Sequence, residues 1–302
     1  MTLCFDIGGS AIKSATISDG GEIGALSRVP TPLQDFAAFT AALAEAIDKA
    51  EIGVGEGVAI SITGVIDPDS HIIKCANIAC IDGRALAPEL TALLGRPVLV
   101  ANDADCFALA EAGAGAGRGH RIVFGAILGT GVGGALVIEG KVLQGAGGIA
   151  GEWGHGPAAA NFAGPNRDPI PSYPCGCGQV GCVDTIGAAR GLERLHRHLH
   201  GVDLPSTQIV ALWEGGDAVA AHTVDCYVDL VASPLALVVN VVGASIVPVG
   251  GGMSNSTALI AGIDAAVRKR ILRTTSAPLV VPGQCRVEPG LIGASLLAQG
   301  AH

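Results

Sequence analysis

Aromatic and charged side chains are scarce in this sequence. Aromatic residues make up only 3% of the 302 residues and charged residues 15%, with acidic residues outnumbering basic ones to give a net charge of −9. No block of lysines or arginines is present, which argues against nucleic acid or an anionic lipid surface as the main partner. The hydrophobic fraction is nonetheless 49%, enough for a large core, and the length favours two domains over one.

A secretory signal is also missing from the N-terminus, where no basic segment precedes an apolar one. The uncharged stretch 230–263 is long enough to span a bilayer, but Pro234, Pro248 and the glycines at 250–252 favour a buried helix, a strand and a turn. We therefore expect a cytoplasmic protein without a membrane span. Its nine cysteines should stay reduced, which makes disulfides the weaker account of their clustering.

Apolar segments of strand length alternate with helical patterns, as at 35–50 and 87–94 for helices. Three strands followed by strands separated by helices are typical of an α/β domain with a mixed sheet.

One pattern occurs twice, at 6–23 and again at 126–143. Each copy is predicted to be a strand, a glycine turn with a hydroxyl residue, Ser10 or Thr130, and then two more strands. Chance similarity between two glycine-rich hairpins would explain this, but a duplicated pair of domains explains it better.

The chemistry expected of these turns is phosphate binding. Glycines let the backbone approach an anion, and successive N–H groups with a hydroxyl donate to its oxygens. Asp6, at a strand end, could hold Mg²⁺ through water, and Lys13 could balance phosphate charge. The turns lack the lysine of a P-loop and join strand to strand, so they are not P-loops.

Six motifs occur here in the order found in the ROK family, which this chain resembles over essentially its whole length. They are DIGGS (6–10), ANDAD (101–105), LGTGVGG (128–134), GEWGH (151–155), CGCGQVGC (175–182) and VGGGMS (249–254). The family contains bacterial sugar kinases and related sugar-responsive repressors. The repressors carry a helix-turn-helix before the first motif, and Asp6 leaves no room for one, so we do not expect a DNA-binding regulator.

The resemblance implies a duplicated, actin/hexokinase/Hsp70-like (ribonuclease H-like) two-domain α/β fold with an interdomain cleft. We expect an N-terminal domain over 1–118 and a C-terminal domain with a substrate loop over 119–289. A helix over about 290–302 should pack back on the first domain.

Asp103 is the expected catalytic base, which would accept the proton of the attacking sugar hydroxyl. The residue pattern alone favours a different role, in which Asp103 caps a helix starting at Ala104; the family resemblance reverses this preference. The resemblance also places the sugar among Thr63, Gly64, Asn77, Asn102, Asp103, Glu152, His155 and Asp184. Glu152 and His155, three apart, could share one face of a helical turn.

Phosphates and the adenosine of ATP are expected on the glycine motifs. The implied residues are Asp6, Gly8, Gly9, Ser10, Lys13, Gly129, Thr130, Gly131, Gly133, Gly251 and Gly252. Mg²⁺ would accompany ATP. For Gly251 and Gly252, an ordinary strand-to-helix turn is the alternative.

Three cysteines within eight positions, Cys175, Cys177 and Cys182, form a Cys₃His set with His155 that is typical of structural zinc. A closed site with four protein ligands has no place for a reactive water, so the zinc would be architectural. The alternatives are a cluster of free thiols in a glycine-rich turn or disulfides. The other six cysteines are scattered and read as core residues.

Some positions depart from the family pattern. Thr63 replaces a usual Pro and Asp105 a usual Asn, and Asp184 stands where a longer Glu usually contacts the sugar, which puts the sugar's identity in doubt. The segment between His155 and Cys175 is longer than in many relatives and is similar to the bacterial N-acetylglucosamine kinase branch.

Together these features predict ATP-dependent phosphorylation of the 6-hydroxyl of a hexose, with N-acetylglucosamine first. N-acetylmannosamine kinase and glucokinase are alternatives of the same class, and a sugar-sensing protein without turnover is one of a different class. The expected partners are a small sugar and ATP, with no nucleic acid or membrane, in a homodimer.

Overall fold

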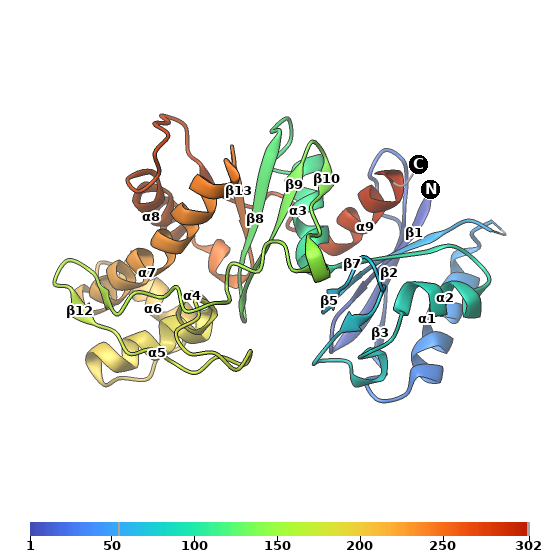
Figure 1. Ribbon diagram of the computed structural model, residues 1–302, viewed down its shortest axis with the longest axis horizontal. Helices are drawn as coiled ribbons and strands as arrows, with labels where there is room; N and C mark the ends of the chain where they lie inside the picture. The colour runs from blue at the N-terminus through green and yellow to red at the C-terminus, as the bar shows by residue number, and fades with distance from the viewer. Residues whose placement is uncertain (54, 301–302) are drawn as a thin grey trace. The chain divides into compact units, whose positions relative to one another are not determined.

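The computed structural model describes residues 1–53 and 55–300, so residues 301–302 of the expected C-terminal helix lie outside the described part. The chain forms two compact units (Figure 1). The first comprises Met1–Gly115, Leu136–Ala150 and the chain from Cys285 onward, and the second comprises Ala116–Ala135 and Gly151–Gln284.

The first unit is built on a five-stranded sheet with the order β3-β2-β1-β4-β7. Its strands are β1 (Thr2–Ile7), β2 (Ala11–Ile17), β3 (Ser27–Pro30), β4 (Val58–Ile62) and β7 (Val98–Asn102). The hairpin strands β1, β2 and β3 are antiparallel, and β1, β4 and β7 are parallel. A two-stranded sheet of β5 (Val65–Ile66) and β6 (Ile73–Lys74) and the short helices η1 (Ala79–Ile81) and η2 (Ala146–Gly148) complete the connections.

One face of this sheet carries large apolar side chains, and the other face carries small ones. Leu3, Phe5 and Ile7 of β1 join a core with α1 (Phe36–Ala50) and α2 (Leu86–Leu94). Cys4 points to the other face, where Ala59 lines a second core against α3 (Asp103–Gly113) and α9 (Pro289–Gly300). The small side chains let α9 pack directly on β1 and β4, and α9 also packs against α3 (Figure 1).

A second sheet repeats the order of the first as β10-β9-β8-β13-β14. Its strands are β8 (Ile122–Leu128), β9 (Val132–Ile138), β10 (Lys141–Val142), β13 (Val247–Gly250) and β14 (Val280–Pro282). In both sheets the first strand of the hairpin, β1 or β8, pairs on its other side with parallel strands. These are β4 and β7 in the first sheet and β13 and β14 in the second. The repeat confirms the duplicated α/β fold expected from the two glycine hairpins.

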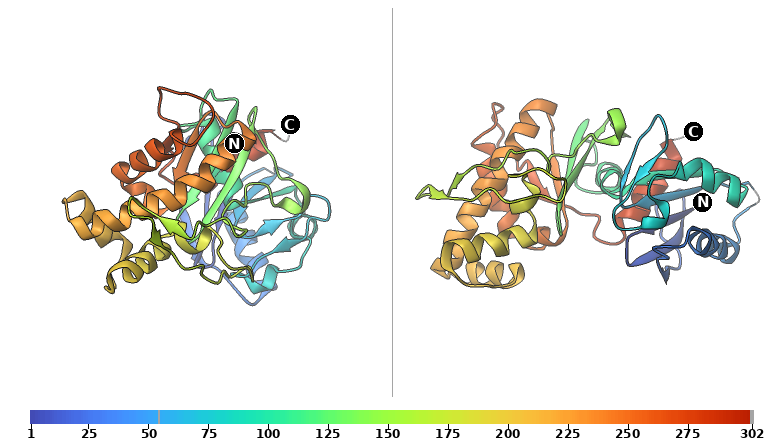
Figure 2. Two further views of the ribbon diagram at one scale, coloured as in Figure 1. Left: turned by 60° about the vertical axis from the view of Figure 1, so that its left-hand side comes forward. Right: turned by 60° about the horizontal axis from the view of Figure 1, so that its bottom comes forward.

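The helices of the second unit follow the glycine turn and the cysteine-rich loop. They are α4 (Asp184–Gly187), α5 (Ala189–His200), α6 (Ser206–Glu214), α7 (Ala218–Val242), η3 (Gly252–Asn255) and α8 (Thr257–Arg268). A small hairpin of β11 (Phe162–Ala163) and β12 (Asp168–Pro169) lies beside α7 and is coloured yellow-green in Figure 2.

Within the described residues, α7 is the one helix long and apolar enough to cross a membrane. More than half of its most apolar window is buried inside the protein, as in a core helix. The helix continues through the buried Pro234, and β13 and η3 follow it, as the uncharged stretch predicted.

The close packing of α9 on α3 leads to a prediction about Gly293. An added Cβ at this buried glycine would lie 1.9 Å from the Cys106 carbonyl oxygen, which is backbone and cannot rotate away. We expect Gly293→Ala to lower the free energy of unfolding by about 1–3 kcal/mol through overpacking. Urea denaturation followed by circular dichroism measures this.

The matched control is Gly300→Ala in the same helix, where nothing lies within 4 Å of the added atom. It should change the free energy of unfolding by less than about 0.5 kcal/mol. Equal effects of the two substitutions would contradict the packing argument.

Candidate functional site

The first glycine turn, Gly8–Ser10, joins β1 to β2 and has a charged cluster at its base. The Asp6 carboxylate accepts a hydrogen bond from Ser61 Oγ at 3.1 Å and lies 3.6 Å from Lys13 Nζ. Lys13 is also 2.8 Å from Glu288 Oε2. Burial raises the pKa of Asp6, while the Lys13 charge opposes that shift. The cluster therefore places a partly buried carboxylate and an ammonium group next to the turn.

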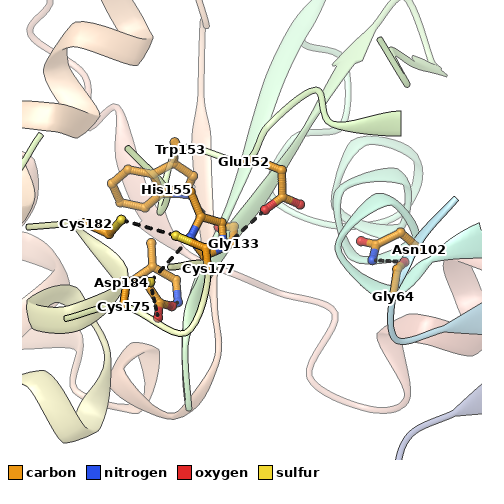
Figure 3. A network of polar contacts seen from close by, with 11 residues as sticks. Gly64, Asn102, Gly133, Glu152, Trp153, His155, Cys175, Cys177, Cys182 and Asp184 are labelled. Atoms are coloured by element: carbon orange, nitrogen blue, oxygen red, sulfur yellow. Dashed lines mark hydrogen bonds and ion pairs between the residues drawn. The ribbon is translucent and has the colours of Figure 1, made fainter. Parts of the chain in front are cut away.

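Asn102 and Asp103 lie where β7 ends and α3 begins. Asn102 is the N-cap: its Oδ1 accepts from the Ala104 N–H at 2.7 Å, and its Nδ2 donates to the Gly64 carbonyl at 2.8 Å (Figure 3). Asp103 is thus the first helical residue rather than the cap, and it is exposed. Asp103 Oδ1 also accepts from the Ala104 N–H, at 3.0 Å. The interpretation of Asp103 as the N-cap of a helix starting at Ala104 is wrong, because the helix starts one residue earlier and Asn102 is its N-cap.

The loop after β4 brings further expected sugar residues toward the same strand ends. The Thr63 N–H donates to the Ile7 carbonyl at 3.2 Å. Gly64 has a φ of 121°, and a Cβ there would lie 2.8 Å from the Lys74 carbonyl oxygen, so this position requires glycine. A Cβ on Gly9 would touch Asn77 at 3.6 Å, which places Asn77 beside the first glycine turn.

The second glycine turn is held by a side chain from α4. The Val132 N–H donates to Asp184 Oδ1 at 2.7 Å, and a Cβ on Gly131 would lie 2.8 Å from that oxygen. The Gly129 N–H closes the turn on the Gly131 carbonyl at 3.0 Å. One oxygen of Asp184 is therefore engaged by the turn backbone, an interaction that the sequence did not reveal.

Gly251 packs directly against this turn, and its neighbour Gly252 lines a cavity. Gly251 has a φ of 84°, and a Cβ there would lie 2.5 Å from the Leu128 carbonyl oxygen. The cavity has a volume of about 380 Å³ and is bordered by α6 and η3, including Val210, Ala211, Gly252 and Met253. The contribution of α6 has no sequence signal, since its residues belong to none of the motifs.

The GEWGH segment is tied to the second turn by Trp153, whose Nε1 donates to the Gly133 carbonyl at 2.7 Å. The segment forms turns instead of the helical turn expected for Glu152 and His155. Glu152 Oε2 still lies 3.7 Å from His155 Nε2 (Figure 3). Burial raises the pKa of the Glu152 carboxyl group.

The opposite side of the His155 ring faces the cysteines. Cys175 Sγ lies 3.7 Å from His155 Nδ1, and Cys177 Sγ lies 3.6 Å from Cys182 Sγ (Figure 3). The four potential ligand atoms all lie within 4.8 Å of one another. Hydrogen bonding from the Gln179 backbone N–H lowers the pKa of Cys177 to about 7. This arrangement is a candidate metal site, and all nine cysteines are free thiols.

The expected site residues thus form two groups, each at the strand ends of one unit. The first unit holds Asp6, Gly8, Gly9, Ser10, Lys13, Thr63, Gly64, Asn77, Asn102 and Asp103, and the second holds Gly129, Thr130, Gly131, Gly133, Glu152, His155, Cys175, Cys177, Cys182, Asp184, Gly251 and Gly252. Glu288, the partner of Lys13, was not found from the sequence because 275 residues separate the two.

Over residues 2–301 the chain matches the model of the ROK family. It is 37% identical to the N-acetylgalactosamine kinase AgaK of Shewanella sp. (strain ANA-3), covering 98% of this chain and 96% of the relative. It is 35% identical to the N-acetyl-D-glucosamine kinase of Salmonella typhimurium, covering 97% of each.

Two solved structures are similar over nearly the full length. The ROK hexokinase of Thermus thermophilus superimposes with a TM-score of 0.83 at 28% identity, covering 100% of this chain and 99% of that one. The ROK family glucokinase of Streptomyces griseus, solved with glucose and AMPPNP, superimposes with a TM-score of 0.76 at 27% identity, covering 99% of each.

The hydrogen bond between Val132 and Asp184 leads to a stability prediction. Asp184→Ala leaves the partly buried Val132 N–H without its charged acceptor, so we expect a loss of about 1.5–3 kcal/mol in the free energy of unfolding. Asp184→Asn keeps an oxygen acceptor of the same length and should lose about 1 kcal/mol or less. Chemical denaturation of both variants measures the difference, and an alanine variant as stable as wild type would contradict the anchoring role.

Proposed function

Because the chain belongs to the ROK family, we propose that it is an ATP-dependent kinase acting on the 6-hydroxyl of an N-acetylhexosamine. The observation that carries the proposal is Asp103, an exposed carboxylate at the carboxyl end of β7, next to an asparagine that already caps the helix. The Asp103 carboxylate, whose Oδ1 also accepts a hydrogen bond from the Ala104 N–H at 3.0 Å, can serve as a base toward a bound hydroxyl.

In the proposed reaction the Asp103 carboxylate takes the proton of the sugar 6-hydroxyl while the oxygen of that hydroxyl attacks the γ-phosphorus of ATP. The bond from that phosphorus to the β–γ bridging oxygen breaks, and ADP leaves with the electron pair. Positioning and charge stabilisation supply most of the rate in such transfers. Asn102, held between Gly64 and Ala104, would orient the sugar beside the base.

The two glycine turns would hold the phosphates. Gly9 and Ser10 in the first unit and Thr130, Gly131 and Gly133 in the second would offer backbone N–H groups and hydroxyls to phosphate oxygens. Gly8 and Gly129 would shape the turns, because their N–H groups are bonded to the Ala11 and Gly131 carbonyls. Mg²⁺ bound with ATP would neutralise phosphate charge, and Asp6 is the carboxylate suited to hold it through water. Lys13 adds a positive charge at the base of the first turn.

The adenosine would lie in the cavity next to Gly251 and Gly252. The cavity's apolar wall from α6 suits a flat purine ring. Because both positions are glycine, no side chain there would block the adenosine from contacting the backbone.

On the sugar side, Thr63, Gly64, Asn77, Asn102, Glu152, His155 and Asp184 are the proposed contacts. Asp184 Oδ1 is bonded to Val132, and Oδ2 lies 4.0 Å from Cys175 Sγ, so a sugar hydroxyl would share Oδ2 with that thiol. Its shorter side chain, where relatives usually carry Glu, makes this contact the weakest of the set.

The Cys₃His cluster would hold a structural Zn²⁺. In a tetrahedral zinc site, Zn–S bonds of about 2.3 Å and Zn–N bonds of about 2.0 Å put neighbouring ligand atoms about 3.5–3.8 Å apart. The observed separations of 3.6 Å and 3.7 Å fit that geometry. With Nδ1 on the metal, Nε2 of His155 faces Glu152, the orientation that a neighbouring carboxylate commonly supports.

N-acetylglucosamine is the proposed first substrate, because named relatives act on N-acetylglucosamine or N-acetylgalactosamine. These two sugars differ only in the configuration at C4, so a few hydrogen bonds decide between them. N-acetylmannosamine and glucose are the other candidates.

We further propose a cytoplasmic homodimer. Support for the dimer comes from α7, where Leu237 and Val241 expose 61% and 74% of their surface. Exposed apolar side chains on one helix favour a protein contact. The net charge of −9 disfavours nucleic acid as a partner.

The catalytic proposal is tested by Asp103→Asn in an ADP-release assay with ATP and Mg²⁺. The assay covers N-acetylglucosamine, N-acetylgalactosamine, N-acetylmannosamine and glucose. We expect kcat to fall by about 10²–10⁴-fold, because a general base contributes that much, with the sugar Kd little changed. Asp105→Asn, which removes a carboxylate two residues away on the same helix, is the matched control and should retain activity.

Equal activity of the Asp103 variant and wild type would overturn the assignment of the base. A folded wild-type protein that binds one of these sugars without releasing ADP would instead favour the sugar-sensing function.

The zinc proposal is tested by Cys177→Ser. Serine is a poor zinc ligand, so the variant should lose one equivalent of Zn²⁺ per chain and melt several degrees lower. Elemental analysis and calorimetry measure both effects. Cys80→Ser, at a cysteine outside the cluster, should keep the metal content of wild type; unchanged zinc in both variants would contradict the site.

A further inference from the structure

A second group of metal-binding side chains lies away from the Cys₃His cluster, between α7 and the β11–β12 hairpin. His222 and Cys226 are one helical turn apart on α7 and therefore share a face. Asp168 of β12 lies opposite them: its Oδ2 is 2.8 Å from His222 Nε2 and 3.8 Å from Cys226 Sγ. These three atoms all lie within 4.8 Å of one another.

The hairpin is held against α7 by contacts that need no ion. The Gly164 N–H donates to Asp229 Oδ2 at 3.1 Å. Gly164 has a φ of 74°, and a Cβ there would lie 2.6 Å from Cys226 Sγ, so the backbone approaches the thiol as closely as glycine permits. The positions of Asp168 and Cys226 are thus set by the fold before any ligand arrives.

The environment of the group is enclosed but reachable. Cys226 is fully buried, whereas the side chains of Asp168 and His222 are 23% and 27% exposed. Burial, with the neighbouring Asp168 charge, raises the pKa of the Cys226 thiol to about 12, so without a metal the thiol stays protonated. A divalent cation would replace that proton.

A second imidazole flanks the group. The ring centroid of His200, at the end of α5, lies 5.3 Å from that of His222. Burial lowers the pKa of His200, and its Nε2 lies 3.1 Å from Thr223 Oγ1. His200 thus adds a further imidazole beside the group, although it is not one of the three proposed ligands.

We propose that Asp168 Oδ2, His222 Nε2 and Cys226 Sγ bind a second Zn²⁺, with water completing the coordination. One carboxylate oxygen, one imidazole nitrogen and one thiolate suit zinc or cobalt and do not suit magnesium or calcium. Binding displaces the thiol proton of Cys226 to solvent and moves the Nε2 proton of the neutral His222 ring to Nδ1. The hydrogen bond between His222 and Asp168 is then replaced by two metal bonds.

The consequence concerns the long segment between His155 and Cys175, which contains the hairpin. This segment joins two ligands of the Cys₃His cluster. A metal between Asp168 and α7 would fasten its middle to the core of the second unit. The ion at Asp168, His222 and Cys226 would then reduce the conformational mobility of the segment whose two ends are ligands of the Cys₃His ion.

The first test counts zinc in the full-length protein after equilibration with Zn²⁺ and removal of loosely bound metal. We expect two equivalents per chain in wild type and one in His222→Gln and in Cys226→Ser. Glutamine can still donate to Asp168, and serine can replace the weak thiol donor, so both variants keep the apo contacts. Cys80→Ser, which removes a thiol outside both clusters, should keep two equivalents.

The second test follows tryptic cleavage after Arg167, the residue preceding Asp168, while Zn²⁺ is raised from one to two equivalents. We expect the second equivalent to slow cleavage several-fold in wild type and to leave the rate in His222→Gln unchanged. This readout does not depend on sugar phosphorylation. A zinc content that is the same in wild type, His222→Gln and Cys226→Ser would overturn the proposal. So would a second equivalent that protects wild type and His222→Gln alike, and either result would leave a hydrogen-bonded anchor at this position.

Discussion

The hydrogen bond from the Val132 backbone to the Asp184 carboxylate is the contact on which the second unit's candidate site depends. A glycine-rich turn has no side chains of its own to pack, so an outside group must hold its N–H donors in place. Asp184 does this at 2.7 Å, and it follows the buried Cys182 by only two residues. The expected phosphate turn and the cysteine loop are therefore directly connected, and a displacement of one would displace the other.

Trp153 strengthens the same connection from the other side. Its bond to the Gly133 carbonyl fixes the segment that carries Glu152 and His155. A metal on the cysteines would then act on a loop that the fold has already placed, which is how a structural ion contributes most to a neighbouring binding surface. The β11–β12 hairpin extends this arrangement, because it lies within the chain between His155 and Cys175.

In the first unit the corresponding constraint is the close approach of α9. A Cβ on Gly290 would lie 2.3 Å from Asp6 Oδ1, so the start of α9 covers the Asp6 carboxylate. The same helix entry brings Glu288 to Lys13. Burial by this helix raises the pKa of Asp6, and the small side chains of the sheet face make that burial possible.

The sequence by itself determined the duplicated α/β fold, the family and the presence of both glycine turns, because local hydrophobic periodicity and short motifs encode them. It also brought His155 and the three cysteines into one hypothesis, since thiolate spacing is a local property. Tertiary structure alone decided that Asn102 caps α3, that Asp184 holds the second turn and that Glu288 pairs with Lys13. The grouping of Asp168 with His222 and Cys226 is of the same kind. Each of these depends on where a helix starts or on which distant segments pack together, and packing is a property of the whole chain that no local pattern records.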